Sequence, residues 1–278
     1  MINQLGHVVL GKCDECAIHH RSMCGISGSE LQKEISSISR IRRVRAGETI
    51  LAESAPSNIV GNVVSGALRL VKTLSDGRQQ IVGLLLPSDM FGRVFASCSR
   101  FAVEAATDAV LCCFDRSAFE AILARHCELE HHMLLAALDE LDAARDCMLL
   151  LGCQTVLERI ATFVLSIYRR SAYKGCAREP GQTSPVIAIP ISRRDLATYL
   201  GTTVETISRS IHLMARMGVI RILDPRHLQI LNSHRLVQMS GREELGRSDQ
   251  ISPTDIMGRL GWGGGIQRDY EADTNAAI

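Results

Sequence analysis

The chain has 278 residues, of which 46% are hydrophobic and 22% charged, and its formal net charge is +1. This length can bury two modest cores, and because no apolar run approaches the length of a membrane span, we expect a soluble two-domain protein without membrane association. The amino terminus lacks the basic start and long apolar centre of a signal peptide, so we expect a cytoplasmic protein whose 10 cysteines are thiols rather than a disulfide framework.

The first motif is a cysteine-rich segment within residues 1–28. Cys13, Cys16 and Cys24 have the spacing C-x2-C-x7-C, which suits a soft metal centre. Both zinc and an iron–sulfur cluster take thiolate ligands, and His19 or His20 could complete a zinc site locally. A cluster with four cysteine ligands would need a further thiol from the next domain. The candidates for that thiol are Cys98, Cys112 and Cys113.

A β domain is predicted over residues 29–127. Helical spacing at Glu30–Ile41 gives way to short apolar runs separated by recurrent glycines, which is typical of an antiparallel roll or barrel. Ser75–Arg78 is its clearest hairpin turn. Glu104–Phe114 is predicted to be the closing strand. Because successive side chains of a strand face opposite ways, only one of its two adjacent cysteines can face the amino-terminal segment.

A long helix with heptad spacing follows, which we place at residues 128–158. Five residues fall at offsets of four, three, four and three: Leu134, Leu138, Leu141, Arg145 and Met148. Such an a/d seam predicts a homodimer, whereas the alternative is a single amphipathic helix that packs on its own domain. Arg145 is costly in a seam unless its charge is paired or reaches water, so it would make assembly adjustable.

Two short helices joined by a tight turn are predicted at Ile191–Met217, within a domain at residues 159–239. Apolar residues share one face of each helix, Gly201 permits the turn, and Thr202 or Thr203 can cap the second helix. Gly218–Leu231 contains two short apolar runs around a turn, which predicts a wing. The alternative is a pair of core helices with a solvated polar face; the wing favours a winged helix-turn-helix.

The second of these helices directs base-reading side chains away from the buried positions. Arg can donate two parallel hydrogen bonds to guanine, Glu can accept a hydrogen bond from cytosine, and Ser can hydrogen-bond to either base. Arg193 and Arg194 open the first helix, where we expect phosphate contacts. The candidate DNA-contacting residues are Arg193, Thr203, Glu205, Thr206, Ser208 and Arg209.

The signals of ordered structure fade after about Met239. Residues 240–278 mix charge with glycine and few apolar residues, so we expect a flexible tail.

Two cysteine–histidine pairs could suggest an enzyme. Cys16 lies close to His19 and His20, and His126 precedes Cys127, but neither arrangement comes with a general base and a third residue that orients it, or with the ligand set of an open metal site. No catalytic residue is predicted.

Taken together, residues 13–235 resemble the cyclic-AMP receptor/FNR superfamily of transcription regulators. The resemblance rests on early cysteines, a glycine-punctuated β domain, a long seam helix and a winged helix. It implies an α+β fold with an amino-terminal cyclic-nucleotide-binding-like β-roll, a long dimerisation helix and a carboxy-terminal winged helix-turn-helix. The implied partners are double-stranded DNA, a second copy of the chain and RNA polymerase.

Two sequence motifs make the resemblance more specific. Val204–Arg209 looks like the FNR-type E-x-x-S-R motif, which implies that Glu205, Ser208 and Arg209 read a TTGAT half-site of a palindrome. The turns around Asp76–Gly83 resemble the polymerase-contacting loops of the family, although any solvated hairpin would look the same.

The cysteines also resemble the FNR segment in its alphaproteobacterial spacing. Alignment of the closing strand puts Cys112 at the family's fourth ligand position after Cys13, Cys16 and Cys24, with Cys113 as the alternative. In that family four thiolates hold an oxygen-labile 4Fe-4S cluster that supports dimerisation and DNA binding without oxygen. The resemblance therefore implies an oxygen-responsive regulator and favours iron–sulfur over zinc. A zinc-stabilised or non-sensing member of the superfamily is the alternative.

A sibling branch of that superfamily binds cyclic nucleotide through a Glu after a glycine and an Arg before a small hydroxyl residue. Here Gly92 is followed by Arg93, and Arg100 is followed by Phe101. A bound cyclic nucleotide would therefore find no carboxylate to accept from its ribose hydroxyl and no side-chain hydroxyl to contact its phosphate. The sequence therefore argues against cyclic nucleotide as a ligand.

Overall fold

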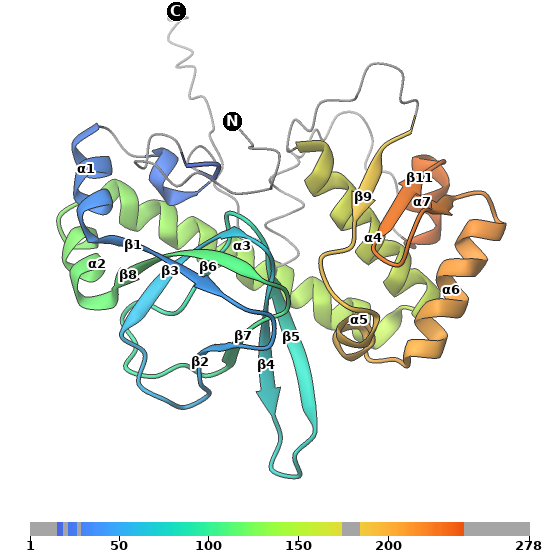
Figure 1. The fold of residues 1–278 in the computed structure, drawn as a ribbon, viewed down its shortest axis with the longest axis horizontal. Coiled ribbons are helices and arrows are strands. Elements are labelled where there is room, and N and C mark those ends of the chain that lie inside the picture. Colours follow the sequence, from blue (N-terminus) through green and yellow to red (C-terminus); the bar gives the residue numbers. More distant parts are fainter. Residues whose placement is uncertain (1–15, 19–21, 27–28, 174–183, 242–278) are drawn as a thin grey trace, which may run out of the picture.

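The computed structural model describes residues 16–18, 22–26, 29–173 and 184–241. Figure 1 shows a β-roll, a long helix that runs behind it, and a smaller helical unit with a short sheet at the other end. This arrangement confirms the predicted α+β class. The predictions made for Cys13, His19 and His20, and for the tail beyond residue 241, lie outside the described residues.

The roll is built from two antiparallel sheets of four strands each within the described residues, in the orders β1-β8-β3-β6 and β2-β7-β4-β5. Its strands are β1 (Ser39–Val44), β2 (Thr49–Leu51), β3 (Ile59–Ser65), β4 (Leu68–Thr73), β5 (Gln79–Leu85), β6 (Met90–Phe91), β7 (Ala102–Ala105) and β8 (Ala109–Asp115). The helical segments beside it are η3 (Met23–Ile26), α1 (Ser29–Ile38) and α2 (Arg116–Leu123). The predicted helical segment therefore ends three residues early, because Ile41 belongs to β1 and pairs with β8.

The hairpin turn predicted at Ser75–Arg78 joins β4 to β5, and the Leu74 amide donates to the Arg78 carbonyl at 2.8 Å. The single closing strand predicted at Glu104–Phe114 is wrong. The chain turns after β7 because Thr107 and Asp108 use their side chains to accept backbone hydrogen bonds, each of 2.9 Å, from the β-roll segments before β4 and β2. The two halves of the predicted strand consequently lie in different sheets.

The region predicted as one long helix, residues 128–158, is divided between helix α3 (Cys127–Cys153) and the first turn of helix α4 (Val156–Tyr173). The break falls at Gln154 and Thr155, where Glu158 accepts a 2.7 Å hydrogen bond from the Thr155 amide and the Thr155 hydroxyl faces the Glu158 amide at 3.4 Å. This reciprocal pairing is a capping box, which starts a new helix. The helix that carries the predicted seam therefore ends before residue 158.

The smaller unit contains α4 and a winged helix-turn-helix. Its further elements are β9 (Val186–Ala188), α5 (Arg193–Leu200), α6 (Val204–Arg216), β10 (Ile220–Ile222), β11 (His227–Ile230) and α7 (Ser233–Met239). In the described residues β10, β11 and β9 form one antiparallel sheet, so the predicted wing is confirmed. Two elements were not predicted from the sequence: β9, which has three residues, and α7, which is capped by Asn232 and packs against α4.

One apolar cluster spans the boundary between the roll and the smaller unit. Val71 and Ile81 from β4 and β5 share this cluster with Ile160 of α4, Leu196 of α5 and Met214 of α6. The helix-turn-helix is therefore packed on the roll rather than tethered to it. Within the described ranges, no helix combines the length and the apolar character needed to cross a bilayer.

Candidate functional site

The turn between α5 and α6 has the geometry predicted for it. Ser192 caps α5 by accepting from the Asp195 amide at 3.0 Å, and the helix ends at Gly201, whose φ of +63° favours glycine. Of the two threonines considered as caps, Thr203 caps α6: its hydroxyl accepts from the Thr206 amide at 3.2 Å. Both helices thus begin on a side-chain cap.

The candidate base-reading residues lie on the outer face of α6, while Ile207 and Ile211 of the same helix are buried. Glu205 and Arg209 are exposed, and Ser208 is half-buried beside them. Hydrogen bonds from its own amide and from the Thr203 hydroxyl lower the pKa of Glu205, and the charge of Arg209 lowers it further. Glu205 is therefore a charged acceptor at neutral pH.

The amino-terminal turn of α5 supplies two cations. Arg194 is exposed, whereas Arg193 is half-buried, and burial lowers the pKa of its guanidinium. In the described part of the chain, Nη1 of Arg193 is buried and has no hydrogen-bond partner. An unsatisfied buried donor is costly, and a phosphate oxygen would satisfy it.

The wing between β10 and β11 is held by Asp224. Its carboxylate accepts from the amides of Arg226 and His227 at 2.7 and 2.9 Å, and its other oxygen lies 2.7 Å from Nδ1 of His227. Arg221, Arg226 and His227 are all exposed. The wing therefore presents basic side chains on a turn whose backbone is fixed.

Strand β8 directs Cys112 and Cys113 into different parts of the roll. Cys113 lies in the apolar cluster between the two sheets, where burial raises the pKa of its thiol. Cys112 belongs to a second cluster on the outer side of the roll, together with Phe114 and Phe119, and Cys16 and Cys24 pack against this same cluster. Of the two adjacent cysteines, Cys112 is thus the one on the side of the amino-terminal segment.

The other member of the predicted ligand set, Cys13, lies outside the described residues. Among the residues that the structure does describe, no three His, Cys, Asp or Glu side chains are grouped closely enough to hold a metal ion. Cys98, the third candidate for the distant thiol, is exposed between β6 and β7 and forms an isolated bridge with Pro56.

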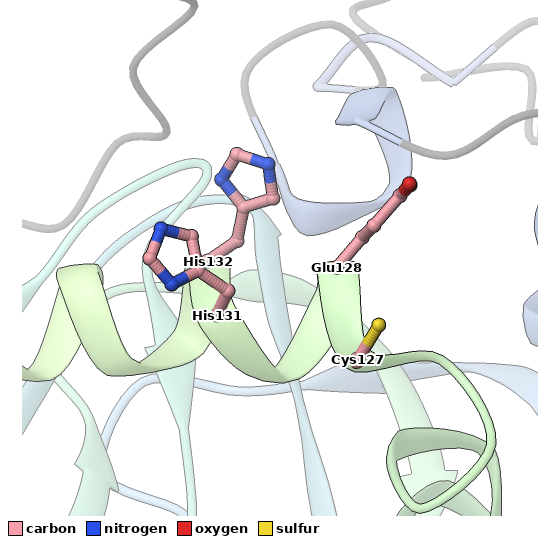
Figure 2. A pocket seen from close by; sticks show the side chains of 4 residues that line it. All are labelled: Cys127, Glu128, His131 and His132. Carbon is pink, nitrogen blue, oxygen red and sulfur yellow. The ribbon is translucent and has the colours of Figure 1, made fainter.

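A pocket of about 510 Å³ opens at the first turns of α3 (Figure 2). The pocket is lined by Cys127, Glu128, His131 and His132. Among the described residues, these side chains do not form a group of three or more that could hold a metal ion. The adjacent His126 lies 3.4 Å from Glu34 of α1, measured between Nε2 and Oε1. His126 is therefore oriented toward α1.

Helix α3 packs on the molecule through one face and exposes the predicted seam on the other. Leu129, Ala143 and Leu150 are buried. The apolar seam residues are each at least 46% exposed: Leu134, Leu138, Leu141 and Met148. The charge of Arg145 is paired with Asp142 at 3.0 Å, which is the condition under which an arginine is tolerated in a seam.

A β-roll, a helix with an exposed apolar seam and a winged helix-turn-helix define a DNA-binding transcription regulator. Comparisons with known proteins agree. Residues 41–126 match the cyclic nucleotide-binding domain family, and residues 158–239 match the Crp-like helix-turn-helix domain family. The chain belongs to the Crp/FNR family of transcription regulators, whose members are not enzymes.

Relatives match along most of their length. The transcriptional activator protein FnrL of Cereibacter sphaeroides is 37% identical, over 86% of this chain and 95% of the relative. The nitrogen fixation regulation protein FixK of Bradyrhizobium diazoefficiens is 33% identical, over 83% and 96%. The structure of FixK2 from Bradyrhizobium japonicum is similar with a TM-score of 0.67 at 33% identity, and covers 74% of this chain and 100% of that chain.

Proposed function

We propose that this regulator binds TTGAT-type palindromes as a homodimer and that oxygen controls this binding through a 4Fe-4S cluster. Cys13, Cys16, Cys24 and Cys112 would hold the cluster. The observation that carries the proposal is the position of Cys112 on the outer side of the roll, in the apolar cluster against which Cys16 and Cys24 pack. Four thiolates are the usual ligands of such a cluster.

The exposed face of α6 supports base reading. Arg209 can donate in a fork to guanine, Glu205 is a charged acceptor for a cytosine amino group, and Ser208 can serve either partner. Arg193, with its unsatisfied guanidinium nitrogen, and the cap residues Thr203 and Thr206 would contact phosphates beside the recognised bases.

The exposed seam of α3 supports dimerisation. Apolar side chains at heptad spacing bury their surface when two such helices pair. Two recognition helices related by a two-fold axis then reach major-groove faces about 34 Å apart, which is one turn of duplex. The hairpin between β4 and β5, around Asp76–Gly83, is our candidate contact for RNA polymerase.

The position of η3 supports a link between the cysteine segment and dimerisation. Cys24 lies within η3, and η3 contacts α3. When bound, a 4Fe-4S cluster supplies a centre that oxygen degrades. A change in how Cys16 and Cys24 are held would therefore act directly on the helix that carries the seam, and would shift a monomer–dimer equilibrium.

Purification without oxygen, with absorption spectra and iron and sulfide analysis, tests the proposal. We expect a coloured protein that retards a TTGAT palindrome anaerobically and releases it in air. A colourless protein that contains zinc would contradict the proposal and would identify a zinc-stabilised regulator instead.

Cys112→Ser and Cys113→Ser form a matched pair, because they exchange the same atom one residue apart on opposite sides of β8. We expect Cys112→Ser to lose the cluster and anaerobic DNA binding, and Cys113→Ser to keep both. The reverse result would assign the fourth ligand to Cys113.

A further inference from the structure

Arg69 on β4 joins the roll to the first helix of the helix-turn-helix. Its guanidinium binds Asp195 of α5 and also Glu104 of β7, where Nη2 and Oε2 are 2.8 Å apart. Asp195 is buried, and a carboxylate oxygen accepts a 2.7 Å hydrogen bond from the Ser192 hydroxyl. Removal of Arg69 would leave the largely buried carboxylates of Asp195 and Glu104 without this cation, which is strongly unfavourable.

The carboxy-terminal end of α5 is held by side chains from two other elements. The last carbonyls of a helix have no partner within the helix. Here Gln80 of β5 donates to the Thr198 carbonyl at 2.7 Å, and Arg159 of α4 donates to the Leu200 carbonyl at 3.0 Å. Helix α5 is therefore fixed along its side by β4 and at its end by β5.

A third contact fixes α4 to the roll. Arg170 makes a two-pronged ion pair with Asp89, with distances of 2.8 Å and 3.1 Å, and it also donates to the Pro87 carbonyl at 2.7 Å. The side chains of Arg170 and Asp89 are 12% and 2% exposed. Because α4 packs against α6, this contact also restricts the recognition helix.

These contacts leave the recognition helix little freedom relative to the dimer helix. The apolar cluster that spans the domain boundary includes Leu150 of α3 as well as residues of β5, α5 and α6. Apolar contacts are not directional, so without the polar contacts the smaller unit could rotate about the break at Gln154 and Thr155 while the cluster stays buried. With them, each recognition helix keeps one distance and one angle to the two-fold axis of a dimer.

We propose that Arg69, through Asp195 and assisted by Gln80, sets the half-site spacing that the regulator accepts; this inference rests on the dimeric binding proposed above. A change of one base pair between half-sites displaces one of them by about 3.4 Å and rotates it by about 34°. A docked helix-turn-helix cannot follow such a change, whereas a released one can. Arg69 is thus a positioning residue for DNA recognition that does not itself touch DNA.

The test uses the full chain, prepared anaerobically, with DNA in which two inverted TTGAT half-sites are separated by lengths that vary in single base pairs, and a fragment with one half-site. The variants are Arg69→Glu, Asp195→Arg and the exchange that combines both. Arg78→Glu is the matched control, because Arg78 is exposed at the tip of the same hairpin and pairs with Asp76 rather than with α5.

The wild type and Arg78→Glu should bind one separation at least about tenfold more tightly than its neighbours, as expected when each misplaced contact costs a substantial part of the specific affinity. Arg69→Glu should accept neighbouring separations within about threefold, with unchanged affinity for the single half-site. Asp195→Arg should accept them likewise, and any gain in affinity from the cation added beside Arg193 should be equal on every fragment. The exchange should restore the preference. Thermal melting and light scattering verify that each variant is folded and dimeric.

Two results would overturn the inference: a wild-type spacing preference in folded Arg69→Glu, or a loss in that variant that is equal on the single half-site and on every palindrome. A wild-type protein that bound no palindrome at any separation would overturn the proposed function together with it.

Discussion

At the scale of single residues, the helix-turn-helix separates side chains that read bases from those that hold phosphates. Glu205 and Arg209 are exposed on α6, and hydrogen bonds from its own amide and from Thr203 lower the pKa of Glu205. Arg193 instead sits half-buried at the start of α5 with an unsatisfied nitrogen. The first kind of contact depends on base sequence and the second does not.

Arg209→Ala and Arg193→Ala should therefore differ in kind. Arg209→Ala should cost about 1–3 kcal/mol on the preferred palindrome and relax the preference at one base pair. Arg193→Ala should weaken binding to all sequences alike and reduce the slope of log K against log salt by about 1. Titrations of single-substitution DNA at several salt concentrations measure both. An equal loss on every sequence for Arg209→Ala would reassign that residue to the phosphates.

Gly201 shows that backbone conformation, rather than space, fixes the turn. A Cβ at this position would meet no atom closer than 3.6 Å, but the φ is +63°. We expect Gly201→Ala to destabilise the protein by about 1–2 kcal/mol in urea unfolding. Gly152→Ala is the control, since Gly152 is helical with no atom within 4 Å of a built Cβ, and should stabilise by about 0.5–1 kcal/mol. Equal changes in the free energy of unfolding for the two variants would show that the positive φ of Gly201 does not fix the turn.

At the scale of elements, α3 has two faces with different purposes. One face is buried against the molecule at Leu129, Ala143 and Leu150, and the other exposes the apolar seam. The heptad spacing of the seam extends back through His131 to Cys127, two of the residues that line the pocket in Figure 2. The pocket therefore lies at the amino-terminal end of the proposed dimer interface.

In a parallel pair of α3 helices, the two Cys127 thiols face each other across the two-fold axis. We expect a short bis-maleimide, added anaerobically, to link two chains through Cys127. The linked species should be absent in Cys127→Ser and present in Cys98→Ser, which removes another exposed thiol. Denaturing gel electrophoresis detects it. Persistence of the linked species in Cys127→Ser would argue against a parallel seam.

At the scale of the whole molecule, the sequence predicts what depends on neighbours along the chain. The heptad spacing of α3, the caps and Gly201 of the helix-turn-helix and the wing are local signals, and the structure contains all of them. The alternation of Cys112 and Cys113 follows from strand geometry alone. Which of them faces Cys16 and Cys24 depends on the side of the roll that the amino-terminal segment covers, and no local pattern reports that.

Contacts between distant segments are the part that sequence patterns do not predict. Arg69 and Asp195 are separated by 126 positions, and each is an ordinary charged residue in its own element. The strand predicted at Glu104–Phe114 divides because of side-chain hydrogen bonds to segments 40 and 62 residues away. Strand β9 has three residues and is defined by pairing with β11. All of these are fixed by tertiary structure.

The shared core and the ion pair of Arg170 with Asp89 predict that the roll and the smaller unit unfold as one cooperative unit. Asp89→Asn would remove the negative charge of the two-pronged ion pair with the buried Arg170, so it should cost about 3–5 kcal/mol. Asp76→Asn, which breaks the exposed pair with Arg78, should cost less than about 1 kcal/mol. Calorimetry should show one transition for the wild type and for both variants, at a lower temperature for Asp89→Asn, because the apolar cluster still couples the two units. Two transitions in the wild type would mean that the apolar cluster does not couple the domains.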